Sequence, residues 1–439
     1  MQTIQQLQTD LQAGRVTSER LVEQSLEAIE DYRKSGGAAF VHVDAAAALD
    51  AARASDAARR VGYVPSVIAG LPISVKDLFD VRGQVTAAGS RVLASAPAAT
   101  EDAEAVARLR AAGAILVGRT NMSEFAFSGL GVNPHYGTPR APHDDTRVAG
   151  GSTSGGAVSV AKGMAVATLG TDTGGSIRIP AAFCDLVGFK PTAHRVSLRG
   201  GVPLSRTLDS AGPLARSVAC CATLDRILSG QSLDARPAPL AGLRLYVTRD
   251  FVMDGADAAV EQAFEAALAR LSARGATIVP FDFPELRDLP TINAGGGFTA
   301  AEAWQWHRKL LSERGDAYDP RVAMRIRRGE KQSAGDYIEL IDARARMMAI
   351  AATRLREADA WLMPTVAVVP PRVSELQQDD AFFATNAMVL RNTSVLNFLD
   401  GCAVSLPTGR AGIGLAVCGL HNADARVLQV SGAIEAELA

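Results

Sequence analysis

Two serines and one lysine have the clearest potential for chemistry in this chain. Ser152 and Ser176 each follow two glycines, and Lys76 ends the short apolar run 71–75. Glycines before a nucleophile let backbone N–H groups turn inward, where they can hold a developing oxyanion. One such donor is worth about 3–4 kcal/mol of barrier stabilisation. The two loops therefore predict acyl chemistry on a serine.

Lys76 could serve as the base in such chemistry if burial lowers its pKa. An ordinary lysine has a pKa near 10.4, so only about one in a few thousand is neutral at pH 7. A useful base needs a pKa of about 7–8. Burial can supply that change, which corresponds to about 4 kcal/mol. Taken alone, Lys76 is better explained as a solvated lysine at the end of a strand, but the two serine loops favour catalysis.

Other nucleophile and phosphate motifs fail at particular residues. A P-loop needs a lysine where Gly156 stands, and the dinucleotide fingerprint needs a glycine where Pro134 stands. The GxSxG elbow of α/β-hydrolases is absent around the serines of these loops. Ser159 and Lys162 match the SxxK motif, but its partner motifs SDN and KTG are missing. We therefore interpret this pair as part of a helix.

Histidines do not point to a site. A Ser-His-Asp triad is not excluded by spacing, because its members can come in any order. The chain has six histidines, and we expect each of them on the surface or in a loop. His135 and His143 are too far apart for a helical metal pair. We expect no metal and no cofactor.

Several long runs, in the same order, resemble the amidase signature family. The runs are 70–77 (GLPISVKD), 120–126 (TNMSEFA), 150–156 (GGSTSGG), 169–184 (LGTDTGGSIRIPAAFC), 187–192 (VGFKPT) and 209–214 (DSAGPL). The dense matches cover roughly residues 65–220, and weaker similarity extends over nearly the whole chain. The resemblance implies a hydrolase that acts on carbon–nitrogen bonds.

The resemblance also implies a catalytic triad. Ser176 would be the nucleophile, Ser152 the bridging serine and Lys76 the ultimate base, with a cis peptide bond before Ser152. Other expected roles are oxyanion stabilisation by the backbone amides of Thr173, Gly174, Gly175 and Ser176, bracing of the loop by Asp172 and Arg178, and substrate contacts by Ser128, Gly129 and Thr153. Thr153 could instead serve only to turn its loop.

The predicted function is hydrolysis of small linear or aryl amides through an acyl-enzyme on Ser176, with carbamates and esters as further candidate substrates. Two alternatives stay open. One is the A subunit of a tRNA-dependent amidotransferase, which resembles this chain and needs partner subunits. The other is a binding protein on a catalytically dead amidase scaffold, against which the three intact triad positions count.

Alternating helices and strands must position these residues. Residues 17–31 are predicted to form a helix, and a helix at 102–112 leads through a glycine into a strand at 114–117. The same helix–glycine–strand unit recurs between Val260 and Val279, and residues 157–169 predict a buried helix and strand between the serine loops. This alternation predicts an α/β sandwich around a parallel or mixed sheet. The resemblance specifies one α/β/α sandwich around a large twisted mixed sheet, the amidase signature fold.

Composition is that of an ordinary globular protein. Of 439 residues, 48% are hydrophobic and 21% charged. We expect one amidase domain over residues 1–439, with a signature core at about 65–220 and a more variable part at about 221–439 that shapes the substrate pocket. We expect a monomer or homodimer.

Charge and cysteine content exclude some partners and compartments. The net charge of −2 gives no electrostatic case for direct nucleic-acid or membrane binding. A dense basic group is expected on a solvated helix face: Arg325, Arg327, Arg328 and Lys331. Five cysteines without CxxC spacing fit free thiols in a reducing compartment. With no signal peptide or apolar span evident, the expected location is the cytoplasm.

Overall fold

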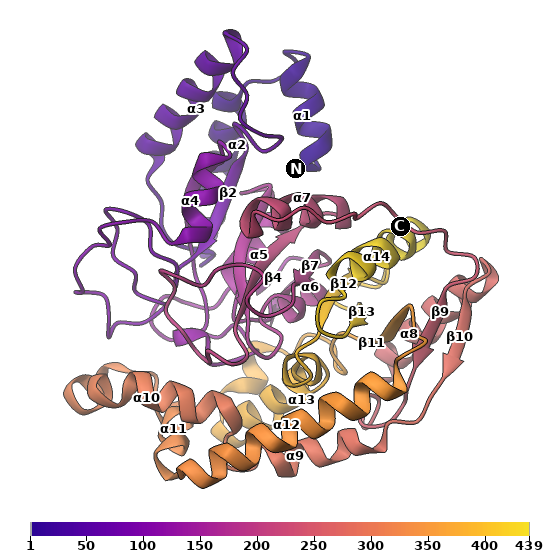
Figure 1. Cartoon of the computed structure of the whole chain (residues 1–439). Coiled ribbons are helices and arrows are strands. Elements are labelled where there is room, and N and C mark those ends of the chain that lie inside the picture. The colour runs from indigo at the N-terminus through magenta and orange to yellow at the C-terminus, as the bar shows by residue number, and fades with distance from the viewer. Residues whose placement is uncertain (1, 439) are drawn as a thin grey trace.

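A computed structural model describes residues 2–438 of the protein. An 11-stranded sheet forms its centre (Figure 1). In spatial order its strands are β1 (Phe40–His42), β3 (Ile115–Thr120), β2 (Pro72–Lys76), β6 (Ala167–Asp172), β8 (Ser210–Ala215), β7 (Val187–Lys190), β12 (Cys402–Pro407), β13 (Gly414–Gly419), β11 (Ala360–Pro364), β9 (Arg244–Val247) and β10 (Thr277–Pro280). A small second sheet pairs β4 (Arg140–Ala141) with β5 (Asp144–Val148).

The large sheet is mixed. Strand β2 runs parallel to both β3 and β6, whereas β8 is antiparallel to its neighbours β6 and β7. Strand β7 pairs with β12 in antiparallel register, Ala403 opposite Lys190, so strands from the two halves of the sequence lie next to each other. The predicted α/β fold with a large mixed sheet is confirmed.

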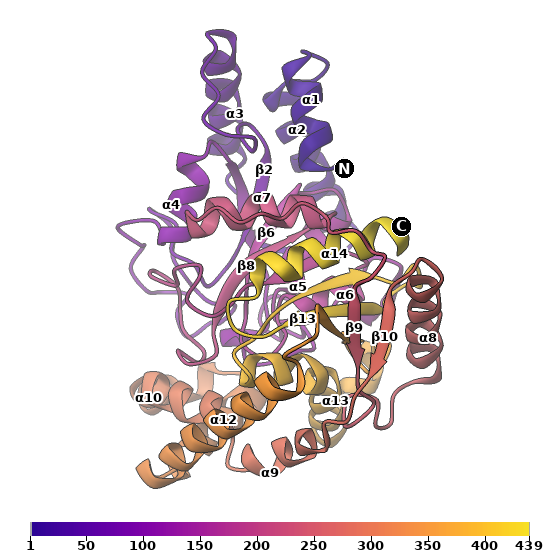
Figure 2. The same cartoon turned by 45° about the vertical axis from the view of Figure 1, so that its right-hand side comes forward.

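Helices cover both faces of the sheet. They are α1 (Ile4–Gln12), α2 (Ser18–Lys34), α3 (Ala45–Arg60), α4 (Glu104–Ala111), α5 (Ser154–Ala161), α6 (Arg178–Phe183), α7 (Val218–Ser229), α8 (Ala258–Ala273), α9 (Leu289–Ile292), α10 (Gly297–Arg314), α11 (Pro320–Arg327), α12 (Ala334–Arg354), α13 (Asp379–Phe398) and α14 (Asp424–Leu438). Helices α7 and α14 lie side by side across one face of the sheet, with α5 and α6 behind it (Figure 2). Helices α9 to α12 form a separate group below the sheet in Figure 1.

Strand β8 shows how the sheet divides the core. Leu214 packs in one cluster with residues of α5 and α6, whereas Ala211 and Ala215 pack in another with residues of α7. Successive side chains of a strand point to opposite faces, so positions of different parity meet different helices. Both faces are buried, which explains why the whole of β8 is buried.

Most local elements agree with the sequence patterns. Helix α2 begins after Thr17, whose side chain accepts a hydrogen bond from the amide of Arg20, and runs three residues past the predicted end. The helix–glycine–strand units are α4 with β3 and α8 with β10. Ser159 and Lys162 lie in and directly after α5, as expected. The histidine prediction is wrong for His307, which is fully buried in α10 against Tyr318, because the aromatic cluster around it supplies an apolar pocket.

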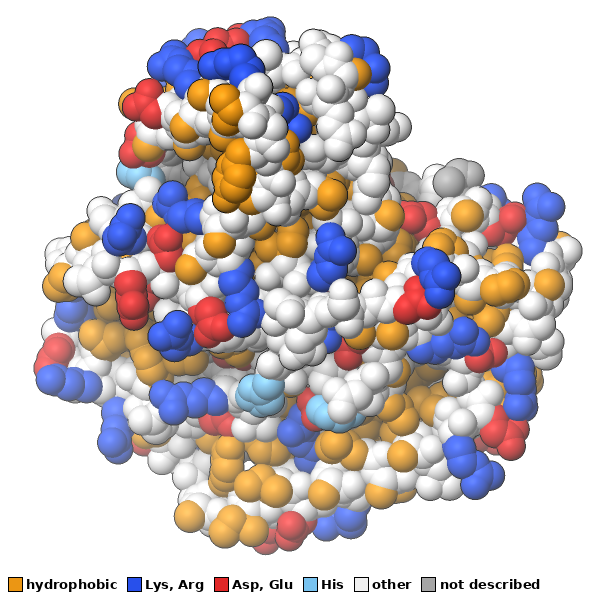
Figure 3. Space-filling model, turned by 45° about the horizontal axis from the view of Figure 1, so that its top comes forward, with side chains coloured by type: hydrophobic (Ala, Val, Ile, Leu, Met, Phe, Trp, Pro, Cys, Tyr) orange, Lys and Arg blue, Asp and Glu red, His pale blue; other side chains and the backbone are white. Residues whose placement is uncertain are grey.

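Neither the cysteines nor the surface shown in Figure 3 indicates a functional site. All five cysteines are buried and free. On the face in Figure 3, basic and acidic side chains are interspersed with neutral ones. Along residues 2–438, no helix combines the length and apolar character that a membrane crossing requires.

Candidate active site

Strand β2 carries Lys76 into the interior of the protein. The side chain is fully buried, and its Nζ atom donates hydrogen bonds to Ser152 Oγ at 2.7 Å and to Thr171 Oγ1 at 2.8 Å. Thr171 belongs to β6, the strand beside β2. Two neighbouring strand ends therefore fix the amine against the first serine loop.

Burial lowers the pKa of Lys76 to about 7, although the carboxylates of Asp172 and Asp209 act in the opposite direction. About half of such a lysine is neutral at pH 7, when it can accept a proton. Burial also raises the pKa of Asp209 to about 6, although hydrogen bonds from Thr173 and from the amides of Leu204 and Ser205 oppose the rise. The position of Lys76 after an apolar run indicated only that its pKa could be lowered, and its complete burial is the physical cause of the lowering.

The first serine loop is held tightly between other loops. The peptide bond between Gly151 and Ser152 is cis, as the resemblance implies. The amide of Gly151 donates to the carbonyl of Gly129 at 2.8 Å. A Cβ atom on Gly151 would lie 2.6 Å from the backbone nitrogen of Gly131, so only glycine fits at this position.

The second serine loop connects β6 to α6 and contains Ser176. Its residue Gly175 has φ +135°, a conformation that favours glycine, and a Cβ atom there would lie 2.1 Å from Thr393 Oγ1. The Thr393 hydroxyl in turn donates to the carbonyl of Gly174 at 2.6 Å. Helix α13 therefore sits directly against this loop.

Asp172 anchors the second loop from its base. Its carboxylate accepts from the amides of Gly175 at 2.9 Å and Ile177 at 3.2 Å. It also accepts two hydrogen bonds from the guanidinium of Arg178, at 2.9 and 3.0 Å, and one from Asn397 Nδ2 at 2.9 Å. Burial alone would raise the pKa of Asp172, but the charges of Arg178 and Lys190 and the hydrogen bonds from Arg178 and Asn397 together outweigh burial and lower it. Asp172 and Arg178 thus form a charged, fully buried pair that holds the loop backbone.

The amides expected to form an oxyanion hole divide into two groups. Gly175 donates to Asp172, so its amide is engaged within the protein and the expectation that it faces the substrate needs correction. Across residues 2–438, no acceptor is found for the amides of Thr173, Gly174 and Ser176. These three stay available to a bound oxygen.

Ser176 faces a cavity of about 410 Å³. The carbonyl of Ser176 accepts from the amide of Thr153 at 3.3 Å, which ties the two serine loops together. Within the described chain, 2–438, the Ser176 hydroxyl forms no hydrogen bond, including to Ser152. It is therefore free to meet a ligand in the cavity.

The predicted substrate-contact residues occupy different places. Ser128 lines the cavity, and its hydroxyl donates to Asn386 Oδ1 at 3.0 Å. Gly129 and Thr153 are not among the lining residues, which corrects the expectation for both. The amide of Gly129 donates to the same Asn386 oxygen. Thr153 is fully buried; its hydroxyl donates to the carbonyl of Thr171 and its amide to the carbonyl of Ser176.

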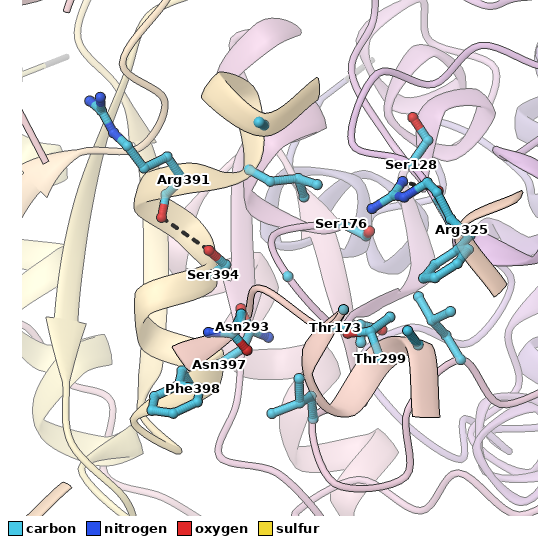
Figure 4. Close-up of a pocket in the computed structure, with 18 of the residues that line it drawn as sticks. Ser128, Thr173, Ser176, Asn293, Thr299, Arg325, Arg391, Ser394, Asn397 and Phe398 are labelled. Atoms are coloured by element: carbon cyan, nitrogen blue, oxygen red, sulfur yellow. Dashed lines mark hydrogen bonds between the residues drawn. The ribbon is translucent and has the colours of Figure 1, made fainter. Parts of the chain in front are cut away.

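The rest of the cavity comes largely from the C-terminal half of the chain. Its lining is mainly apolar, with Phe127, Leu204, Leu208, Phe251, Leu289, Pro290, Met388, Leu390 and Phe398 among it. Polar side chains come from Thr299, Asn293, Ser394 and Asn397, and Figure 4 shows them around Ser176. No histidine lines this cavity. In the part of the chain that the structure describes, no cluster of three or more His, Cys, Asp or Glu could hold a metal ion.

The sequence patterns did not identify three of the site residues. Thr171 lies in the motif run 169–184 but was given no role there, and no local signal marks Asn397, because both act through contacts with distant segments. Arg325 was expected on a solvated helix face, but its side chain is partly buried and lines the cavity. The reason is that its face of α11 borders the cavity, where its guanidinium donates a hydrogen bond to the carbonyl of Phe127. Its neighbours Arg327 and Arg328 are exposed.

Known proteins resemble this chain over most of its length. A sequence profile described as Amidase matches residues 20–428. The 2-amino-5-chloromuconic acid deaminase of Comamonas testosteroni is 38% identical over 381 aligned residues, which cover 84% of this chain and 82% of that relative. The A subunit of the glutamyl-tRNA(Gln) amidotransferase of Cupriavidus necator is 33% identical, covering 99% of this chain and 96% of that relative. A solved structure described as the crystal structure of amidase has a TM-score of 0.91 and 34% identity, and covers 100% of both chains.

Proposed function

The chain belongs to the amidase family and is a hydrolase of carbon–nitrogen bonds, and from this premise we propose that it cleaves small amides through an acyl-enzyme on Ser176. One observation carries the proposal. The buried Lys76 amine, with a pKa of about 7, lies 2.7 Å from Ser152 Oγ, in the loop tied to Ser176 at the cavity wall.

Acylation begins with a proton relay in this proposal. Neutral Lys76 accepts a proton from the Ser152 hydroxyl, and Ser152 accepts one from Ser176. Ser176 Oγ then attacks the carbonyl carbon of the amide. Thr171 supports the relay because its hydroxyl accepts from the lysine Nζ and fixes the direction of the amine. A positioned base of this kind typically contributes about 10²–10⁴-fold to the rate.

The amides of Thr173, Gly174 and Ser176 stabilise the oxyanion that forms. Each such donor is worth about 3–4 kcal/mol of barrier. Asp172 contributes indirectly, since it holds the loop in the conformation that exposes these amides. The loop is preorganised, so its dipoles need not reorient as charge develops.

Collapse of the tetrahedral intermediate completes the first half of the reaction. The C–N bond breaks, and the proton returns through Ser152 to the leaving nitrogen, which departs as an amine or ammonia. Water then attacks the ester carbonyl on Ser176, and the same relay accepts the proton of water and returns it to Ser176 Oγ. Carbamates and esters share this acyl chemistry. The cavity volume fits a small molecule.

A panel of small amides, carbamates and ureas tests this function, assayed with wild type and Ser176→Ala. We expect turnover of at least one class by wild type, its loss in Ser176→Ala, and attachment of a fluorophosphonate probe to Ser176 in mass spectrometry. Ser159→Ala is the matched control, because Ser159 belongs to the competing SxxK motif but donates within α5 to the carbonyl of Gly156. Full activity in a folded Ser176→Ala protein would refute the proposal.

A second candidate is the A subunit of an amidotransferase, favoured by 33% identity to such a protein over 99% of this chain. That function predicts glutamine hydrolysis only in the presence of partner subunits. Hydrolysis of an anilide or other simple amide by the purified chain alone favours the first candidate. A fluorophosphonate probe that fails to label Ser176 in either setting would indicate a catalytically dead scaffold.

A further inference from the structure

The cavity at Ser176 has an excess of positive charge. Three arginines line it, Arg325, Arg328 and Arg391, and no aspartate or glutamate does. In residues 2–438, none of these arginines takes part in an ion pair with an acidic side chain. The remaining walls are largely apolar, so they do little to screen the charge.

Both fully buried arginines elsewhere in the interior, Arg119 and Arg178, have acidic partners, and so does the partly buried Arg195. Arg119 pairs with Asp77 at 2.8 Å, Arg178 with Asp172 at 2.9 Å and Arg195 with Asp225 at 2.7 Å. Removal from water makes an unpaired charge costly, which explains this pairing. A cavity that keeps guanidinium groups without carboxylates is therefore prepared for an anion from outside.

Arg325 is the arginine best placed to meet that anion. Its guanidinium lies over the ring of Phe127, with Cζ 4.5 Å from the ring centre, and Nη1 donates to the carbonyl of the same residue. A guanidinium has five N–H donors, and this is its one hydrogen bond within residues 2–438. In Figure 4 the group lies beside Ser128 and Ser176. Burial, and secondly Arg328, lowers the pKa of Arg325 to about 10, so it stays charged at pH 7.

The other two arginines are less suited to this role, because Arg391 has more hydrogen-bond partners than Arg325 and Arg328 is exposed. The guanidinium of Arg391 donates to the carbonyls of Val252 and Asp254, and Figure 4 shows it pointing away from Ser176. Arg328 donates to the carbonyl of Ala294 at 2.6 Å. Arg328 adds positive charge near Arg325, since the two groups influence each other electrostatically.

We propose that the substrate of this enzyme carries a carboxylate and that Arg325 binds it, which makes Arg325 a specificity-determining residue. This inference rests on the proposed amide hydrolysis at Ser176. It names the substrate class as short amides with a free carboxylate, such as half-amides of dicarboxylic acids. The planar fork of arginine matches a carboxylate through two parallel hydrogen bonds. A neutral amide of the same length leaves the guanidinium unpaired.

Matched pairs of amides test the assignment directly. Succinamate is compared with butanamide, and glutaramate with pentanamide, so that each pair differs by a carboxylate in place of a methyl group. We expect wild-type kcat/KM to favour the acid of each pair by about 100-fold, the range of charge-assisted hydrogen bonds. In Arg325→Met this preference should fall to near one, mainly through a higher KM for the acid. Arg325→Lys should keep an intermediate preference, since the charge remains without the fork.

Arg327→Met is the matched control, because Arg327 ends the same helix, is exposed and does not line the cavity. It should keep the wild-type preference. Equal kcat/KM for both members of each pair in wild type would overturn the carboxylate assignment while leaving amide hydrolysis intact. Equal losses on both members in Arg325→Met would overturn it as well, since they would assign Arg325 to supporting Phe127. Turnover of no amide by wild type would overturn the proposed function and this inference with it.

Discussion

In the proposed mechanism, the burial of Lys76 sets the pH dependence of hydrolysis. This lysine must lose its proton to act as a base, so activity should fall as the pH drops through its pKa of about 7. Its neutral fraction is about nine-tenths at pH 8 and about 1% at pH 5. We therefore expect kcat/KM to fall about 90-fold between these pH values and to be level above about pH 8.

An ordinary lysine would give a different profile. With a pKa near 10.4, the neutral fraction would rise about tenfold per pH unit from pH 5 to about pH 9.5. The two cases differ most between pH 8 and 10, where the buried lysine predicts a plateau. Initial rates at substrate concentrations far below KM measure kcat/KM directly, and a neutral amide avoids titration of the substrate.

Unfolding must be separated from protonation in this assay. The pKa of Lys76 is lower in the folded protein than in the unfolded chain, so the unfolded chain binds more protons between about pH 7 and 10 and stability rises with pH there. Below pH 7 this contribution is constant, so loss of activity on the acid side is not Lys76-linked unfolding. Circular dichroism at each pH provides the control.

Replacement of the lysine completes the experiment. Lys76→Ala should lower kcat/KM by about 10²–10⁴-fold at pH 8, and the residual activity should lose the transition near pH 7. A wild-type kcat/KM that climbs about tenfold per pH unit from pH 8 to about pH 9.5 would refute the assignment of Lys76 as a base whose pKa is lowered by burial. An unchanged transition in Lys76→Ala would do the same.

Three further predictions concern the contacts of the site. Asp209→Asn removes a carboxylate that raises the pKa of Lys76, so the acid midpoint of the kcat/KM profile should move to lower pH; an unmoved midpoint contradicts this. Arg178→Met leaves Asp172 as a buried unpaired charge and should lower the free energy of unfolding in urea by about 3–5 kcal/mol, whereas the exposed-site change Arg327→Met should leave it near the wild-type value. A fragment ending at residue 230 lacks β12, the neighbour of β7, and should show no cooperative thermal transition; a sharp transition would show that the signature core folds alone.

Contiguous sequence made the serine loops and Lys76 predictable. Runs such as 150–156 and 169–184 contain both the glycines and the side chains that the loops need, so their role can be inferred locally. Helices such as α2 and α8 were similarly evident from apolar spacing and caps. The order of the strands in the sheet could not be predicted from the sequence, because β8 lies between β6 and β7 although it follows both in the chain.

Contacts between distant segments were beyond local patterns. Thr171 meets Lys76 across 95 positions of the chain, and only the pairing of β2 with β6 brings them together. The engagement of the Gly175 amide by Asp172 depends on the exact path of the loop. Arg325 sits on an amphipathic helix whose sequence indicates which residues are apolar but not which element it covers. All three features depend on how distant segments or the loop backbone pack in the folded protein, so local sequence patterns could not predict them.

The pairing of β7 with β12 and the hydrogen bonds of Asn397 to Asp172 impose an order on how the candidate site is completed during synthesis. The ribosome produces Lys76, Ser152 and Ser176 in the first half of the chain, but Asn397 and β12 only near its end. A nascent chain thus contains all three proposed catalytic residues while it still lacks Asn397, which binds Asp172, and β12, which pairs with β7. If Ser176 is the nucleophile, as proposed, the direction of synthesis delays completion of its surroundings until translation is almost finished.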